Sequence, residues 1–240
     1  MPARRTTAPR PAAAPSAVAR PQRDAPRTRA TILDAATHEF ATHGLGGARV
    51  DRIAAGAKTN KRMLYYYFGG KDDLFLAVLE RAYERIRIEE QALHLEGLPP
   101  MTAIERLVAF TWSYFLRHPE FLSLLNTENL HRAEHLRRSA KIRALHSPLI
   151  AMLSTLLARG ARDGVFRRGV DPVQLYISIA ALGYFNLSNN ATLSEIFGRN
   201  LKSRPALAER LDHVTALVKT YLARPPVAGL RRRAPQRYAN

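Results

Sequence analysis

Apolar residues recur at every third or fourth position along most of the chain, which is the spacing of a buried face on an α-helix. In the N-terminal part this pattern predicts three short helices: one that carries Ile32 and Phe40, a second over 50–57 and a third over 61–67. Glycine clusters end the first of these helices and follow the third. A much longer helix is expected next, over about 72–93.

Beyond a Gly- and Pro-rich boundary, five further helices are expected near 101–117, 119–130, 134–160, 172–190 and 206–222. No segment alternates apolar and polar residues between hairpin turns, so we do not expect strands. The predicted fold is therefore all-α. It consists of an N-terminal three-helix domain over 27–71 and a C-terminal helical bundle over 72–223.

The formal net charge of the chain is +17. About half of this excess lies in two Pro- and Arg-rich segments, 1–26 and 224–240, which we expect to be disordered basic arms. Such a charge favours a polyanionic partner, either nucleic acid or an anionic membrane. No stretch approaches the roughly 20 uninterrupted apolar residues of a membrane span, and cysteine is absent. We therefore expect a cytoplasmic protein with no membrane partner and no Cys-based zinc site.

The segment 57–68 has the features of a helix-turn-helix unit. Three residues, 57–59, join the second and third predicted helices, which is a suitable length for the turn of this motif. Asn60 is a good N-cap for the third helix, because its side chain can accept a hydrogen bond from a free amide of the first turn. Leu64 and Phe68 lie four residues apart and are expected to face inward. The expected partners of this inner face are Leu33, Phe40 and Ile53.

The opposite face of the third helix presents Lys61, Arg62 and Tyr65, with Tyr66 at its edge. Lysine and arginine pair with guanine or with phosphate, tyrosine hydroxyls bond phosphate, and a helix N-terminus favours an anion. This combination is suited to a major groove of double-stranded DNA. Tyr67 is explained equally well as a half-buried core residue.

These residues resemble the signature of the TetR family of bacterial transcriptional regulators. The matching segments are 32–36, 40–44, 53–54, 60–68, Lys71 and 74–75. The resemblance implies an all-helical homodimer with an N-terminal DNA reader and a C-terminal domain that binds a small effector. It also implies that bases and phosphates are approached by Asn60, Lys61, Arg62, Met63 and Tyr65, and that Tyr66 and Lys71 contact the DNA backbone.

Two positions depart from the family pattern. Lys58 stands in the turn, where the family usually has glycine, and Ala48-Arg49 stands where the second helix usually begins with Ser or Thr. A non-Gly residue in the left-handed region costs roughly 1 kcal/mol, although here it adds a cation near the DNA. The backbone contact made at the missing hydroxyl cap is predicted to pass to Arg49. Lys58, its neighbour Thr59 and Arg49 therefore join the predicted DNA-binding set.

The C-terminal segments supply large apolar side chains with a few polar groups, which is typical of ligand cavities between the helices of a bundle. The predicted effector pocket consists of Trp112, Phe115, Leu125, Glu128, Asn129, Met152, Tyr176, Tyr184 and Asn189. Ordinary core packing explains any one of these residues as well. A further resemblance in 164–167 and 171–176 points to the TetR subgroup that includes repressors of pyrimidine and nicotinate catabolism.

The helices over 172–190 and 206–222 are predicted to form the homodimer. The apolar stripe on the first of them contains Tyr176, Ile179, Ala180, Gly183 and Leu187. The stripe on the second contains Leu207, Leu211, Val214, Leu217, Val218 and Tyr221. Its small residues, Ala180 and Gly183, would allow another helix to approach closely. An exposed stripe of this length would be a liability in a monomer.

A rival chemistry is suggested by 131–135, which fits the His-x-x-Glu-His signature of inverted zinc peptidases. His131 and His135 lie at helical spacing for a shared metal. However, no third carboxylate ligand can be identified, and a solvated polar turn is the favoured interpretation. A zinc peptidase that uses His131, Glu134 and His135 is therefore a remote alternative. No phosphate loop, nucleophile elbow or dinucleotide fingerprint occurs, so we expect neither a cofactor nor enzymatic activity.

The sequence as a whole predicts a ligand-responsive transcriptional regulator. Two third helices of a homodimer would read the half-sites of a palindromic operator, and a small effector would release the DNA by changing their spacing. The main alternative is a sequence-tolerant protein that coats nucleic acid through its basic arms. The effector, the operator sequence and the choice between repression and activation do not follow from the sequence.

Overall fold

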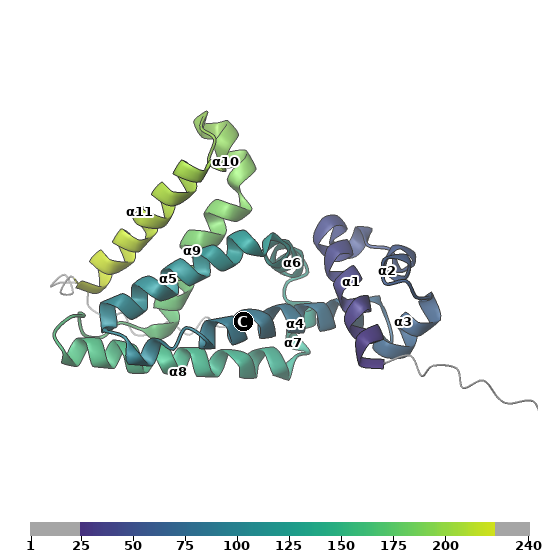
Figure 1. Cartoon of the computed structure of the whole chain (residues 1–240), viewed down its shortest axis with the longest axis horizontal. Helices are drawn as coiled ribbons and strands as arrows, with labels where there is room; N and C mark the ends of the chain where they lie inside the picture. Colours follow the sequence, from purple (N-terminus) through teal and green to yellow (C-terminus); the bar gives the residue numbers. More distant parts are fainter. Residues whose placement is uncertain (1–24, 224–240) are drawn as a thin grey trace, which may run out of the picture.

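A computed structural model describes residues 25–223, and within this range every regular element is a helix (Figure 1). The all-α prediction is therefore confirmed. The first helix begins at Ala25, so Ala25 and Pro26, which were assigned to the basic arm, are helical instead. The remainder of that arm, 1–24, and the tail at 224–240 lie outside the described residues.

Three helices form the N-terminal unit: α1 (Ala25–Gly47), α2 (Val50–Gly56) and α3 (Lys61–Phe68). They gather at one end of the molecule in Figure 1. Helices α2 and α3, of 7 and 8 residues, are too short to be stable alone, so their apolar faces pack on each other and on α1. Leu64 and Phe68 of α3 share one core cluster with Leu33, Phe40 and Ile53, which confirms the predicted inner face.

Helix α4 (Lys71–Gln91) runs from this unit into the C-terminal bundle (Figure 1). Asp72 and Asp73 occupy its first turn, where carboxylates are favoured by the helix dipole. The N-terminal half of α4 contributes Leu74 and Phe75 to the core of the DNA-binding unit, whereas Ile86 belongs to a cluster in the bundle. The helix thereby connects the two hydrophobic cores.

The bundle consists of the remaining elements. They are η1 (Leu95–Gly97), α5 (Pro100–Arg117), α6 (Pro119–Leu130), α7 (Glu134–Arg137), α8 (Ala140–Arg162), α9 (Pro172–Ser188), α10 (Asn190–Phe197) and α11 (Arg204–Ala223). Proline stands in the first turn of α5, α6 and α9, where its missing N–H has no helical partner to lose. No helix within 25–223 is both long and apolar enough to cross a bilayer.

Two predicted elements were wrong in extent. The single helix expected over 134–160 is divided into α7 and α8, because Ser139 caps a new helix by accepting from the amide of Ile142 at 3.2 Å. The helix expected over 172–190 ends at Ser188, since Asn189 leaves helical geometry and donates its amide to the carbonyl of Phe185 at 2.9 Å. Helix α10, which begins at the next residue, was not predicted.

The predicted dimer stripe of α9 faces the wrong way. Ile179 and Gly183 are buried inside the subunit, where α9 packs on α5. A Cβ added at Gly183 would lie 3.4 Å from Phe115 and 3.7 Å from Trp112. Gly183 therefore allows close helix approach, as predicted, but the helix that approaches is α5 of the same chain.

Candidate DNA-reading surface and effector cavity

Helix α3 has one buried side and one exposed side. Leu64 and Phe68 are buried, whereas Lys61, Arg62 and Tyr66 are exposed, Tyr66 to 77%. Tyr65 is 48% exposed and Met63 is half-buried. The amide of Met63 donates to the side chain of Asn60 at 3.0 Å, which confirms Asn60 as the N-cap. The helix thus holds cationic and phenolic groups outward on a surface whose orientation the core fixes.

Two of the predicted cationic contacts are engaged within the protein. Lys61 pairs with the exposed Asp51 of α2 at 2.6 Å, a surface contact that contributes little to stability. Lys71, at the start of α4, donates to the backbone carbonyl of Ala48 at 3.0 Å. The Lys71 ammonium therefore ties α4 to the connection before α2, and its contact with DNA backbone stays a prediction.

The turn between α2 and α3 contains two of the predicted residues. Lys58 has a φ of 50°, in the left-handed region, and its side chain is exposed. The family's usual glycine would adopt this conformation without strain. Thr59 is half-buried, and its hydroxyl oxygen is covered without a hydrogen-bond partner among the described residues. That hydroxyl does not lie on the reading surface.

A residue that the sequence analysis did not single out, Glu39 of α1, supplies the cap that α2 lacks. Arg49 has no capping side chain, and its amide instead donates to Glu39 Oε1 at 2.8 Å. Arg52 Nε donates to the same oxygen at 2.8 Å. The hydrogen bond from Arg52 is the main cause that lowers the pKa of Glu39, with the Arg49 amide acting in the same direction against the effect of burial. Arg49 itself remains exposed beside the reading surface.

The bundle contains a cavity of about 470 Å³ between α4, α6, α8 and α9. Six of the nine predicted pocket residues line it: Phe115, Leu125, Glu128, Asn129, Tyr176 and Tyr184. Its wall also contains Ile177 and Ala181, which are exposed on α9, so the cavity reaches the surface there. Its volume falls within the range of small-molecule sites.

Three predicted pocket residues lie elsewhere. Trp112 is buried in the contact between α5 and α9. Met152 lines a second cavity of about 250 Å³ between α4 and α8. Asn189 ends α9 and bonds its own helix. The side chains of these three, an indole, a thioether and an amide, are all common in pockets, but the helix face on which a residue stands decides what it lines.

The His-x-x-Glu-His segment serves a structural purpose. Both oxygens of the buried Glu128 bind α7: Oε1 accepts the amides of His135 and Leu136 at 2.9 Å, and Oε2 lies 2.8 Å from His135 Nδ1. His131 Nδ1 lies 2.8 Å from a backbone carbonyl, and Glu134 is exposed. Among residues 25–223 no three His, Asp or Glu side chains gather in a group that would hold a metal.

An ion pair that the sequence analysis missed lies at the C-terminal end of α4. Arg87 and Glu90 are 3% and 4% exposed, and their side chains approach to 2.8 Å. Arg87 Nη2 also donates to the hydroxyl of Tyr176 at 3.2 Å. Burial raises the pKa of Glu90 to about 7, although the Arg87 guanidinium acts to lower it. The sequence signal was two charged residues that continue the apolar stripe of α4.

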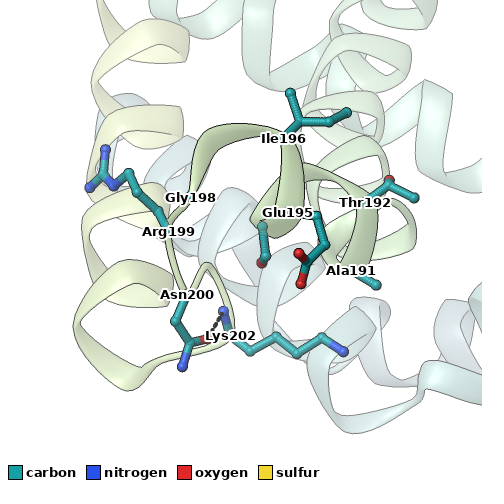
Figure 2. Close-up of a pocket in the computed structure, with 9 residues that line it drawn as sticks. Ala191, Thr192, Glu195, Ile196, Gly198, Arg199, Asn200 and Lys202 are labelled. Atoms are coloured by element: carbon teal, nitrogen blue, oxygen red, sulfur yellow. Dashed lines mark hydrogen bonds between the residues drawn. The ribbon is translucent and has the colours of Figure 1, made fainter.

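A larger hollow, of about 830 Å³, lies around α10 and the loop that follows it (Figure 2). Exposed residues such as Thr192, Glu195 and Lys202 form most of its lining. Such an open hollow does not enclose a ligand, so the cavity between α4, α6, α8 and α9 is the better effector site despite its smaller volume.

A helix-turn-helix unit joined to a helical bundle that encloses a cavity is the architecture of a one-component transcriptional regulator. Comparison with known protein families identifies the family of regulators to which the chain belongs. Residues 32–78 match the family described as "Bacterial regulatory proteins, tetR family". Residues 100–218 match the "Tetracyclin repressor-like, C-terminal domain". The chain belongs to the TetR family of transcriptional regulators, as the sequence predicted.

Similar proteins agree with this assignment. The HTH-type transcriptional repressor NicS of Pseudomonas putida is 40% identical over 200 residues, which cover 83% of this chain and 94% of NicS. The HTH-type transcriptional repressor SCO4008 of Streptomyces coelicolor is 42% identical over 110 residues, 45% of this chain and 53% of that protein. The solved structure of the regulator SCO4942 from Streptomyces coelicolor is 25% identical, with a TM-score of 0.61 over 82% of this chain and 99% of the other. The narrower subgroup stays a prediction.

Proposed function

We propose that this protein is a homodimeric repressor that binds a palindromic operator and is released by a small-molecule effector. The observation that carries the proposal is the two-sided α3, whose exposed face presents Lys61, Arg62, Tyr65 and Tyr66 while Leu64 and Phe68 anchor it. Arginine and lysine on such a face read guanine in the major groove and bind phosphate. A protein acting on chromosomal DNA works in the bacterial cytoplasm, the location expected from the sequence.

Helix α6 supports coupling between the effector and the DNA. It carries Leu125, Glu128 and Asn129 into the cavity wall, and it packs against α1 of the DNA-binding unit. Leu124 of α6 belongs to the same core cluster as the α1–α3 residues. A ligand that displaces α6 would therefore move α1, and with it the reading helix.

An exposed apolar face supports the dimer. Val173, Ile177 and Phe185 of α9 are 43%, 51% and 58% exposed, and Leu217 and Tyr221 of α11 are 44% and 43% exposed. Apolar side chains on two neighbouring helices indicate a surface that another protein covers. A second copy would join through this outer face, which keeps Leu217 and Tyr221 of the stripe predicted on the last helix but replaces the buried stripe predicted on α9. Two reading helices would then address two half-sites.

Footprinting of the full-length protein on the DNA upstream of its own gene tests the proposal. We expect protection of a palindrome, and Arg62→Ala should weaken binding to it about 10-fold or more if Arg62 reads a base. Arg162→Ala, at an exposed arginine in the last turn of α8, is the matched control and should bind as the wild type. Coating without sequence preference, with equal effects of both variants, would contradict a specific repressor.

A further inference from the structure

The side chain of Arg87 has fewer hydrogen-bond partners than its burial requires. It is 3% exposed, and its one side-chain hydrogen bond among the described residues is the 3.2 Å contact to the Tyr176 hydroxyl. Nη1 lies 2.8 Å from Glu90 but not in hydrogen-bonding orientation, and Nε has no acceptor among the described residues. A guanidinium carries five N–H donors, and buried charged donors without acceptors are costly.

A cavity of about 250 Å³ lies directly against this guanidinium, between α4, η1 and α8. Arg87 and Glu90 form its polar end, and Leu149 and Met152 contribute to its apolar wall. The Arg87–Tyr176 hydrogen bond joins the wall of this cavity to the wall of the 470 Å³ cavity. Its volume limits an occupant to a molecule smaller than most ligands, and its lining offers polar groups at Arg87 and Glu90 and apolar contact at Leu149 and Met152.

The ionisable groups around Arg87 do not fully balance its positive charge, which favours an anion beside it. Burial raises the pKa of Glu90 to about 7, so near neutral pH this carboxyl is protonated in a substantial fraction of molecules. Burial raises the pKa of Tyr83 to about 12, raises that of Tyr176 and lowers that of His146, so these three neighbours supply no negative charge. The exposed Glu96 of η1 is the other carboxylate in the lining of the cavity. A buried guanidinium without a permanent counter-charge favours binding of an external carboxylate.

We infer that Arg87 binds the carboxylate of a small organic acid, whose apolar body lies against Leu149 and Met152, and that this acid acts as an effector from a second site beside the 470 Å³ cavity. The first part rests on the geometry of the cavity, and the second rests on the proposed function. The bound carboxylate would supply acceptors for the unpartnered guanidinium nitrogens. It would also compete with Tyr176 for Arg87, which links the ligand to α9 and to the larger cavity.

Thermal-shift and calorimetric titrations of the full-length protein test the carboxylate site, with benzoate and hexanoate as probes and benzamide and hexanamide as their neutral twins. We expect the acids to raise Tm and the amides to leave it unchanged, because only ligands that bind the folded state stabilise it. Arg87→Met should weaken acid binding about 10- to 100-fold, the loss expected for a charged hydrogen bond. Arg87→Lys should retain part of the affinity.

Glu90→Gln provides a test that does not depend on losing Arg87. Removing the competing carboxylate should strengthen acid binding, so a gain of affinity is expected here and a loss in Arg87→Met. Equal stabilisation by acids and amides, equal stabilisation by inorganic phosphate, no stabilisation by either acid, or unchanged binding in Arg87→Met would each overturn the site.

Operator binding measured on the same samples separates this inference from the proposed function. Acid binding at Arg87 with an operator complex that persists would retain the carboxylate site and reject the acid as effector. Absence of any protected palindrome would contradict the repressor proposal whatever the acids do. Release of the operator by the acid in the wild type, but not in Arg87→Met, is the result expected if both hold.

Discussion

The side-chain carboxylate of Glu39 accepts the backbone amide of Arg49 at 2.8 Å, so helix α2 is capped by a residue of α1. In most helices the capping oxygen comes from the residue at the N-cap itself. Here the N-cap is Arg49, which has no acceptor, and the carboxylate arrives from ten positions earlier in the chain. Because Arg52 donates to the same oxygen, α1 holds α2 at two points and thereby fixes the turn that leads into α3.

Replacing Glu39 should therefore destabilise the DNA-binding unit. Glu39→Ala removes the cap and the partner of Arg52, and we expect a loss of about 1–2 kcal/mol in the free energy of unfolding. The pKa of Glu39 is lowered, chiefly by the hydrogen bond from Arg52, so its contribution is present above the ordinary value of 4.5 and is lost as pH falls through the folded pKa. Denaturant unfolding of the wild type and of Glu39→Ala should show a smaller difference in unfolding free energy at pH 4 than at pH 7.

Asp34→Asn is the matched control for this prediction. Asp34 is an exposed carboxylate on the same helix, paired with Arg81 at 2.7 Å, and surface pairs of this kind contribute little. If Asp34→Asn lowers the free energy of unfolding as much as Glu39→Ala does, the effect is common to carboxylates on α1. The capping role of Glu39 would then be contradicted.

Much of the fold could be predicted because it depends on local signals. Asn60 caps α3 through an amide three residues away, and the spacing of Leu64 and Phe68 is enough to identify the buried face. The helix boundaries at Gly69 and Pro172 follow from local backbone properties, the freedom of glycine to adopt a positive φ and the fixed φ of proline.

The features that could not be predicted depend on distant partners. The role of Glu39 depends on Arg52, thirteen residues away, and that of Arg87 on Tyr176, eighty-nine residues away. The stripe containing Gly183 shows the same limit: periodicity indicates that a face is buried but not against which partner, and here the partner is α5. The short α10 was missed, although Leu193, Ile196 and Phe197 stand at helical spacing, because no Gly or Pro separates it from α9.

Lys58→Gly should separate stability from DNA affinity. The φ of 50° at Lys58 costs roughly 1 kcal/mol that glycine avoids, although glycine also gives the unfolded chain more freedom. We expect a free energy of unfolding that is unchanged or up to about 1 kcal/mol higher. If Lys58 contacts phosphate, operator affinity should fall and the salt dependence should decrease by about one counterion. Fluorescence anisotropy over a salt series measures this, and a steeper slope in the variant would contradict the phosphate contact.

A charge on the outer face of α9 should dissociate the dimer. Ile177 is 51% exposed on the face proposed to meet the second copy, and Ile177→Glu would bury a carboxylate there. We expect light scattering coupled to gel filtration to report a monomer at concentrations where the wild type is a dimer. Ile88→Glu, at a 60% exposed position on α4, is the control and should remain dimeric. A dimeric Ile177→Glu would require a different interface.

Glu90→Gln should remove a dependence of stability on pH. Because the folded pKa of about 7 exceeds the ordinary 4.5, the native state holds a proton that the unfolded state has released, so stability falls as pH rises through this window and is level above it. The shift corresponds to roughly 3 kcal/mol. The unfolding free energy of Glu90→Gln relative to wild type should therefore increase by about that amount between pH 4.5 and pH 8. Glu84→Gln, at an exposed residue of the same helix paired with Lys141, should show no such change, and a flat difference for Glu90→Gln would contradict the raised pKa.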